Sequence, residues 1–149
     1  MDIVSPSARS RMMAMVKSKN TMPELWLRHG LHAMGFRYRI HVNGLPGKPD
    51  IVFPGRKAVI FVNGCFWHGH DCPKGRLPKT RKEFWCQKIA SNKERDERNI
   101  RALASLGWRA LIIWECATRD SSILEYSRSW LNGSEPGTIA RSAFGQRNG

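Results

Sequence analysis

The sequence lacks any apolar run of about 18 residues or more, whereas a membrane-spanning helix needs about 20. Its first residues also lack the apolar stretch of roughly 7–15 residues that marks a secretory signal peptide, and the second residue is acidic. We therefore expect a cytosolic protein without a membrane span. Thiols stay reduced in that compartment, so the four cysteines are expected to be metal ligands or buried thiols before disulfides.

Acidic residues are scarce. There are 12 Asp and Glu against 25 Lys and Arg, which gives a formal net charge of +13 and a pI of about 10.4. Positive charges at this density repel one another in the compact state, and a polyanion would relieve the repulsion. Nucleic acid is the first candidate partner; a basic but unspecialised surface is the alternative.

The length and the apolar fraction predict one globular domain with tails. The chain has 149 residues, and 41% of them are apolar, which is enough for a core. We expect a basic N-terminal arm over 1–20, a folded domain over 21–132 and a disordered tail rich in Gly, Ser and Arg over 133–149. The arm is either a helix that orders on a partner or a flexible leader.

Hydrophobic periodicity predicts a mixed α/β domain with a short sheet, in the order α-β-β-β-α-β-α. The first helix begins after Thr21, with Glu24 completing a capping box, and ends at Gly35. Residues 36–42 alternate as a half-buried strand, and 50–53 with 58–62 form a hairpin. A long helix follows over 81–106, capped by Thr80 and Glu83, then a central strand over 108–115 and a last helix over 122–132.

The segment "VNGCFWHGHDC" (62–72) concentrates residue types that bind metals. Cys65, His70 and Cys72 have the chemistry that zinc prefers, and Cys116 follows a later strand that could return beside them. A Cys₃His set is a common closed structural zinc site. The alternative is that Cys65 and Cys116 are buried thiols in an ordinary loop. Cys86 lies inside the long helix and is expected to be a packing residue.

A second set of polar residues suggests acid–base and metal chemistry. Asp50 opens a strand, and a carboxylate at a strand end suits Mg²⁺, which takes one or two carboxylates with water and phosphate oxygens. His68 is two residues from His70, so the two cannot easily share one metal. It is either a general base or a surface histidine.

The long helix carries two polar residues on its apolar stripe. Asn92 and Asp96 continue the spacing of the apolar residues and must find partners if that face is buried. Asp96 could pair with a neighbouring arginine or orient a histidine. Glu24 needs no function beyond its helix cap, unless its helix end faces Asp50.

Adjacent aromatic residues are a further candidate site. Phe66 and Trp67 could cover a zinc site, or they could wedge between base pairs as apolar side chains do in proteins that kink DNA. Met13 in the basic arm could enter from the other groove.

Several of these segments together resemble a known family, the very short patch repair (Vsr-type) DNA mismatch endonucleases. The resemblance covers roughly residues 9–117 and rests on "RSRMMAMVKSKNT", "LPGKPDIVF", "VIFVNGCFWHGHDC", "TRKEFWCQKIASNKERDERN" and "LGWRALIIWEC". It implies a restriction-endonuclease-like fold of the PD-(D/E)-x-K superfamily, with the usual second-strand acidic and lysine residues altered. It also implies an Mg²⁺-dependent, strand-specific nick on the 5′ side of the thymine of a T:G mismatch, which leaves a 5′-phosphate and a 3′-hydroxyl.

The resemblance assigns catalytic roles by position. Asp50 is similar to the Mg²⁺ ligand, helped by the main chain of Val62. His68 is similar to the base that activates water, supported by Asp96, and Glu24 is similar to a helper that holds metal-coordinated water. The family often has a histidine where this chain has Asn63, and an amide cannot transfer a proton at neutral pH.

The resemblance also assigns the remaining residues. Cys65, His70, Cys72 and Cys116 correspond to a structural zinc set, and Phe66 and Trp67 to an intercalating wedge, with Met13 opposite. The family also accepts a histidine where Gly69 stands, and we treat that difference as unimportant.

The implied partner is double-stranded DNA with a T:G mismatch, bound by a monomer in the cytoplasm at the nucleoid. Two other functions fit the same residues. One is a related restriction or nicking endonuclease that cuts unmismatched DNA. The other is a zinc-stabilised DNA-binding module without catalysis, which would leave Asp50, His68 and Asp96 without a role.

Overall fold

The computed structural model describes residues 21–70, 72, 75–133 and 140–141. The predicted arm over 1–20, including Met13, lies outside these residues. So does the predicted tail, apart from Gly133 and the short strand β4 (Ala140–Arg141). The domain boundaries therefore stay a prediction. Among the helices that the structure describes, none is long and apolar enough to cross a membrane.

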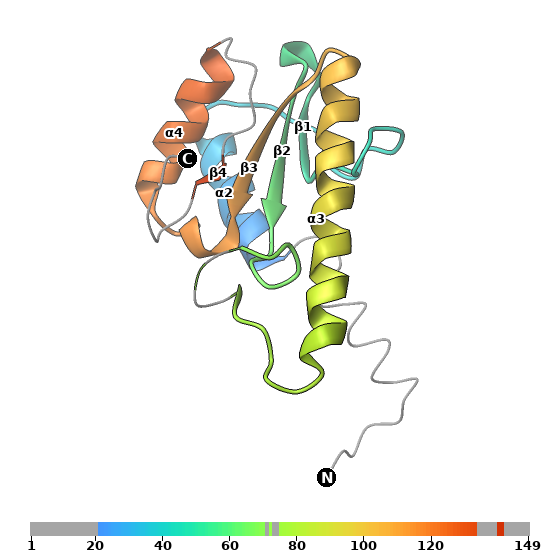
Figure 1. Ribbon diagram of the computed structural model, residues 1–149. Helices are drawn as coiled ribbons and strands as arrows, with labels where there is room; N and C mark the ends of the chain where they lie inside the picture. Colours follow the sequence, from blue (N-terminus) through green and yellow to red (C-terminus); the bar gives the residue numbers. More distant parts are fainter. Residues whose placement is uncertain (1–20, 71, 73–74, 134–139, 142–149) are drawn as a thin grey trace.

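A four-stranded mixed sheet forms the centre of the molecule (Figure 1). Strands β1 (Ile51–Phe53) and β2 (Ala58–Asn63) are antiparallel, and β2 pairs in parallel with β3 (Arg109–Trp114), which pairs in parallel with β4. The predicted hairpin is confirmed: the 3₁₀ turn Pro54–Arg56 joins its strands, and Lys57 turns the chain with a φ of 52°. The predicted strand over 108–115 is confirmed as β3, in the interior of the sheet.

Three helices complete the described domain. They are α2 (Met22–Ala33), α3 (Lys82–Ser105) and α4 (Ser121–Asn132). The cap of α2 is as predicted, because the Glu24 amide donates to Thr21 Oγ1 over 3.4 Å. The predicted cap of α3 is wrong. Arg81 occupies the N-cap position in the left-handed region (φ 55°), without a side-chain capping bond, which moves Thr80 out of the cap position.

The sheet separates two apolar layers, as alternate side chains of each strand point to opposite faces. Helices α2 and α4 cover one face, and their larger core includes Leu27, Leu31, Ile60, Leu111 and Trp130. Helix α3 covers the other face with a smaller core around Val52, Val59, Leu103 and Ala110. Figure 1 shows α3 on one side of the strands and α2 and α4 on the other.

The strand predicted over 36–42 is wrong. The alternation is real, since Phe36 is buried while Arg37 and Arg39 are exposed, but only one bridge forms, between Arg39 and Val52. Strand β1 is three residues long and offers little edge for pairing. His41, with a φ of 57°, then turns the chain out of the extended conformation.

The sheet topology brings three chain segments to one end of the domain. Strands β2 and β3 are parallel, so their carboxyl ends lie at the same edge, where ligands of open α/β sheets bind. Strand β1 is antiparallel to them, so Asp50, just before β1, lies at that edge too. The candidate residues of β1, β2 and the loop after β2 therefore meet there.

Candidate functional site

A cleft of about 720 Å³ opens at this end of the sheet. Its floor is formed by the ends of β2 and β3. One wall is α3, and the other is the start of α2 with the loop before β1. Glu24, Asp50, His68 and Asp96 all line it, as do Val62 and Asn63. The structure thus brings every predicted catalytic residue into one cavity.

Asp50 is held by the strand beside it. The Val62 amide donates a 2.7 Å hydrogen bond to Asp50 Oδ2, which ties the main chain of Val62 to this carboxylate. Burial raises the pKa of Asp50 from 3.8 to about 7; the hydrogen bond from Val62 opposes this shift and the negative charge of Glu24 adds to it. Two acidic groups that lie this close repel each other when both are ionised. A cation bound between them would remove that repulsion, so the pair favours cation binding.

Glu24 faces Asp50, which was the condition for giving it a role beyond the helix cap. It is 3% exposed, and it lines a narrow recess of the cleft together with Asp50. Its Oε2 accepts a 3.0 Å bond from Arg28 Nη1, one helical turn along α2. The arginine therefore offsets the negative charge of this buried carboxylate.

His68 and Asp96 form a hydrogen-bonded pair across the cleft. The Nδ1 atom of His68 lies 2.5 Å from Asp96 Oδ2, and both side chains are about one quarter exposed (24% and 26%). An ionised carboxylate can only accept, so Nδ1 carries the proton of this bond, and in a neutral imidazole Nε2 is then the acceptor. Of the two partners predicted for Asp96, the structure shows the histidine.

The loop that carries His68 packs directly against α3. Asn92 is buried, and its amide nitrogen donates to the main-chain oxygen of Trp67 over 2.8 Å. Gly69, with a φ of +67°, lies so close to α3 that a Cβ there would be 2.5 Å from Ile89 Cγ2 and 2.6 Å from Lys93 Cε. A side chain at this position would therefore require Ile89 and Lys93 to move, and the expectation that the difference at residue 69 is unimportant stays a prediction.

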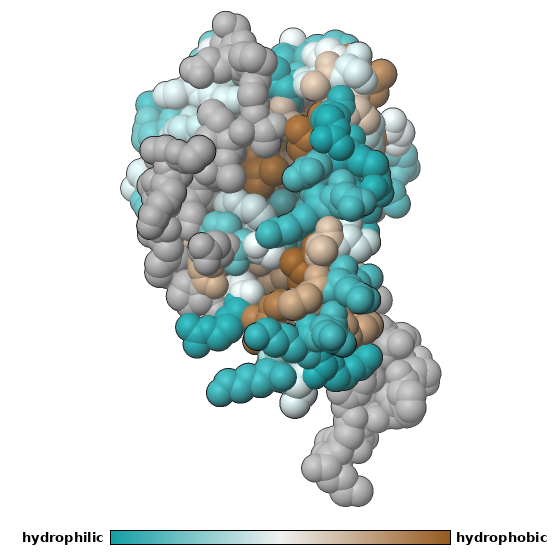
Figure 2. Space-filling model, viewed as in Figure 1, coloured by the Kyte–Doolittle hydropathy of each residue, from teal (hydrophilic) through white to brown (hydrophobic). Residues whose placement is uncertain are grey.

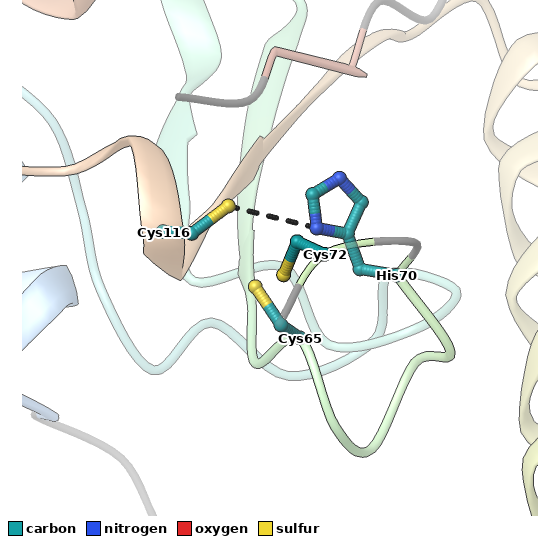
Figure 3. Close-up of side chains that lie close together, drawn as sticks. All are labelled: Cys65, His70, Cys72 and Cys116. Atoms are coloured by element: carbon teal, nitrogen blue, oxygen red, sulfur yellow. Dashed lines mark hydrogen bonds between the residues drawn. The ribbon is translucent and has the colours of Figure 1, made fainter. Parts of the chain in front are cut away.

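The four predicted metal ligands converge behind the loop. One ligand atom from each of Cys65, His70, Cys72 and Cys116 lies within 4.8 Å of the others. Figure 3 shows the three sulfurs and the imidazole of His70 around one space, with Cys116 Sγ 3.6 Å from His70 Nδ1. Three thiols and an imidazole grouped this closely could bind zinc with tetrahedral coordination. Four protein ligands would leave no position for a catalytic water.

The surroundings of the cluster fix its ligands. The imidazole of His70 stacks on Trp114, with the ring centroids 4.3 Å apart and an angle of 13°. The Cys65 amide donates to Glu115 Oε1 over 3.0 Å, which joins the start of the loop to the end of β3. Burial, together with the neighbouring thiols, raises the pKa of Cys65, so a bound cation would be needed to hold it as a thiolate.

Cys86 is not the packing residue that the sequence predicts. It lies on an exposed part of α3, because the buried face of that helix is the one that carries Ile89, Asn92 and Leu103.

The two predicted wedge residues belong to a larger aromatic cluster. Phe66 and Trp67 pack edge to face, with centroids 5.0 Å apart, and both contact Trp85 of α3. Phe84, which is 45% exposed, extends the cluster. Figure 2 shows apolar surface among hydrophilic side chains at the lower end of the molecule, where Figure 1 places the loop after β2 and the start of α3.

Sequence reasoning missed several residues of the site, including three charged ones. Arg28, Lys48 and Glu115 line the cleft or contact its residues. Arg28 had a usable signal, because it lies four residues after Glu24 on one helix face. Lys48 and Glu115 had none, since their positions depend on pairings between distant segments.

The fold and the site define a nuclease. The mixed sheet is restriction-endonuclease-like, and its cleft combines a pair of carboxylates, one buried and one half-buried, with a histidine–aspartate pair. Phosphodiester hydrolysis needs this combination, a place for a cation and a base for water.

Comparison with known proteins agrees. The family described as DNA mismatch endonuclease Vsr matches residues 1–74. The type II nicking enzyme V.XorIIP of Xanthomonas oryzae pv. oryzae is 51% identical, over 83% of this chain and 91% of its own length. The DNA mismatch endonuclease Vsr of Escherichia coli is 41% identical, over 89% of this chain and 88% of its own length. The type II nicking enzyme V.NmeAIP of Neisseria meningitidis is 43% identical, over 82% and 87%. The chain belongs to the Vsr family of DNA endonucleases.

The contact between Gly69 and α3 yields a prediction. Gly69→Ala places a methyl group against Ile89 and puts alanine in the left-handed region, so we expect a loss of about 1–3 kcal/mol in the free energy of unfolding. Gly44→Ala is the matched control, because Gly44 also has a positive φ (+95°) and a Cβ there meets no atom within 4 Å. Urea unfolding of both variants checks the difference, and equal stabilities would contradict the tight contact.

Proposed function

We propose that this protein is an Mg²⁺-dependent, strand-specific endonuclease that nicks duplex DNA on the 5′ side of the thymine of a T:G mismatch. The observation that supports it most is the convergence of Asp50, Glu24 and the His68–Asp96 pair in one cleft. The name of the Escherichia coli relative, a mismatch endonuclease, supports the mismatch. The excess of positive charge, +13, supports DNA as the partner.

In the proposed reaction His68 is the general base. Its Nε2 takes a proton from a water whose oxygen attacks phosphorus, and the bond from phosphorus to the 3′ oxygen breaks. The 3′ oxygen leaves and takes up a proton from solvent water to become a hydroxyl, and the 5′ side keeps the phosphate. The bond to Asp96 keeps the imidazole in the tautomer that this step needs.

Asp50 and Glu24 are proposed to hold Mg²⁺, with the main chain of Val62 as a further ligand and Glu24 acting through water. The fit rests on the chemistry of the donors: two acidic groups face one recess, and burial raises the pKa of Asp50, so a bound cation would favour its ionised form. When bound, Mg²⁺ would supply positive charge to the phosphate oxygens. Asn63 lines the same cleft and can donate a hydrogen bond to a phosphate or water, but it cannot protonate the leaving group.

The Cys₃His cluster is proposed to hold structural Zn²⁺. Its ligand types and close grouping match such a site, and the loop between its ligands carries both His68 and the aromatic pair. A metal there would therefore keep the base and the aromatic residues in fixed positions.

Phe66 and Trp67 are proposed to enter the base stack beside the mismatch, with Met13 entering from the other groove. The exposed edge of their aromatic cluster and the lysines and arginines of α3 support a DNA contact at this end of the domain. We propose that one monomer acts on each site and works in the cytoplasm at the nucleoid.

A nicking enzyme for unmismatched DNA is the second candidate. The relatives V.XorIIP and V.NmeAIP are named type II nicking enzymes, names that support nicking and mention no mismatch. A module that binds DNA without cleaving it is the weakest candidate, because the buried acidic pair and the His68–Asp96 bond would have no use.

Mismatch nicking is tested on a T:G duplex and its T:A counterpart. With Mg²⁺ we expect a nick on the thymine strand of the T:G duplex alone, no nick with Asp50→Ala, and a rate lower by about 10²–10⁴-fold with His68→Ala. Equal nicking of both duplexes would favour the second candidate. A protein that binds the T:G duplex but does not cleave it in Mg²⁺ or Mn²⁺ would contradict the proposed nuclease activity.

The raised pKa of Asp50 predicts a pH dependence of metal binding. Protons and Mg²⁺ compete for this carboxylate below a pH of about 7. The contribution of Asp50 to stability is full below pH 3.8 and is lost as pH rises through about 7, where the metal can restore it. Mg²⁺ should therefore raise the melting temperature more at about pH 8 than at about pH 5.5.

The control for this measurement is Asp50→Asn, which removes the titrating group. Its melting temperature should respond little to Mg²⁺ at either pH. A response of the wild-type protein that is equal at both pH values, or that persists in Asp50→Asn, would place the metal elsewhere.

The metal cluster predicts about one equivalent of zinc per chain by elemental analysis. Cys116→Ser should lose the metal and fold poorly, because it leaves three ligands and buried thiols without a cation. Cys86→Ser is the matched control, since Cys86 is exposed and far along the chain from the cluster. A folded, metal-free wild-type protein would refute the zinc site.

A further inference from the structure

Strand β2 lacks a residue type that its fold usually provides. Its sequence, AVIFVN, contains neither a lysine nor an acidic residue, although the fold belongs to the PD-(D/E)-x-K superfamily. Negative charge grows on the phosphate oxygens in the transition state, and a protein cation next to them lowers that barrier. We therefore searched the cleft for a cation that could act there.

Three basic residues line the cleft among the described residues: Lys48, Lys88 and Arg95. Lys88 and Arg95 are on α3, which is the wall that carries Asp96. Lys48 is on the opposite wall, two residues before Asp50, and it also lines the narrow recess that Asp50 shares with Glu24. It is the one of the three that lines both spaces next to the acidic pair.

The backbone of Lys48 is held on both sides although its side chain is exposed. Leu45 packs into the small core under α3, and the Lys48 amide donates to the Leu45 oxygen over 3.2 Å. Gly47, with a φ of +80°, lies against α3 and β2, so a Cβ there would be 3.1 Å from Asn99 and 3.2 Å from Phe61. Pro49 is buried. The backbone of Lys48 is therefore fixed while its ammonium group is exposed to the cleft. This arrangement suits a contact with a bound ligand, because little of the chain has to become ordered on binding.

We propose that the ammonium group of Lys48 binds a non-bridging oxygen of the phosphate that is cut, and so takes the place of the lysine missing from β2. This inference rests on the proposed nicking function. In this proposal Lys48 takes no part in proton transfer: water adds to phosphorus, the 3′ oxygen leaves, and the lysine neutralises charge on an oxygen that stays bound to phosphorus. Its contribution is therefore greatest in the transition state.

The test compares Lys48→Met, which removes the charge and keeps the length, with Lys48→Arg, which keeps the charge. On a T:G duplex at saturating enzyme, the single-turnover rate should fall about 100-fold with Lys48→Met and recover mostly with Lys48→Arg. The dissociation constant for the same duplex, measured with Ca²⁺ in place of Mg²⁺, should change less than about tenfold, as expected of one phosphate contact.

Lys57→Met is the matched control. Lys57 also has a positive φ, 52° against 51° for Lys48, but it precedes β2 at the end of the sheet away from the cleft, with its Nζ 5.2 Å from the ring centroid of Trp108. Lys57→Met therefore measures the effect of removing one positive charge, and of placing methionine at a positive φ, outside the cleft. Its single-turnover rate should equal that of the wild type, and the melting temperatures of all variants report their folding.

Four outcomes separate the hypotheses. A slow Lys48→Met with an active Lys48→Arg supports the phosphate contact. A Lys48→Met that nicks at the wild-type rate, or whose loss lies only in the dissociation constant, overturns it and leaves the nicking function intact. A Lys57→Met that is equally slow also overturns it, because the effect is then one of net charge. A wild-type protein that does not nick removes the proposed function and this inference together.

Discussion

The attachment of one loop on two sides is the constraint on which the rest of the site depends. On one side, Cys65, His70 and Cys72 meet Cys116, which follows β3. On the other side, the loop contacts α3 through the Asn92 bond to Trp67, the close approach of Gly69, and the His68–Asp96 pair. Without both attachments, His68 would have no fixed position relative to Asp50, which is held on β1 by a bond to β2.

Charge is arranged unevenly around this loop. The chain as a whole is strongly basic, yet the deepest part of the cleft is acidic, with Asp50 and Glu24 partly or fully buried. Arg28 compensates Glu24, and His68 lowers the pKa of Asp50 only in part, so Asp50 keeps a pKa of about 7. The basic side chains attract a polyanion, and the acidic recess attracts a divalent cation. A phosphodiester bound between them would meet both.

Much of this arrangement could be predicted from local patterns. The helix from Thr21, the hairpin and the apolar strand β3 follow from caps, turn residues and periodicity, which depend on neighbouring residues. The ligands Cys65, His70 and Cys72 are close in the sequence and dense enough to stand out. For Cys116 and the catalytic roles, the family resemblance supplied what spacing alone left open.

The remaining errors and omissions have a common physical cause. The strand over 36–42 has the right alternation but lacks a partner long enough to pair with, and Thr80 loses its cap because Arg81 takes a left-handed conformation. The exposure of Cys86 depends on which face α3 turns to the sheet. Lys48 and Glu115 join the site through contacts with segments distant in the sequence. None of these can be read from local pattern, because each is decided by tertiary packing.

The central claim is tested most directly by a crystal structure of the protein on a T:G duplex with Ca²⁺. Calcium can occupy a magnesium site while supporting little cleavage, so the DNA would stay intact. The account predicts the ion between Asp50 and the phosphate on the 5′ side of the thymine, His68 Nε2 facing that phosphate, and Phe66 and Trp67 in the base stack. DNA bound on another face, or a His68 that points away from the phosphate while still bonded to Asp96, would contradict it.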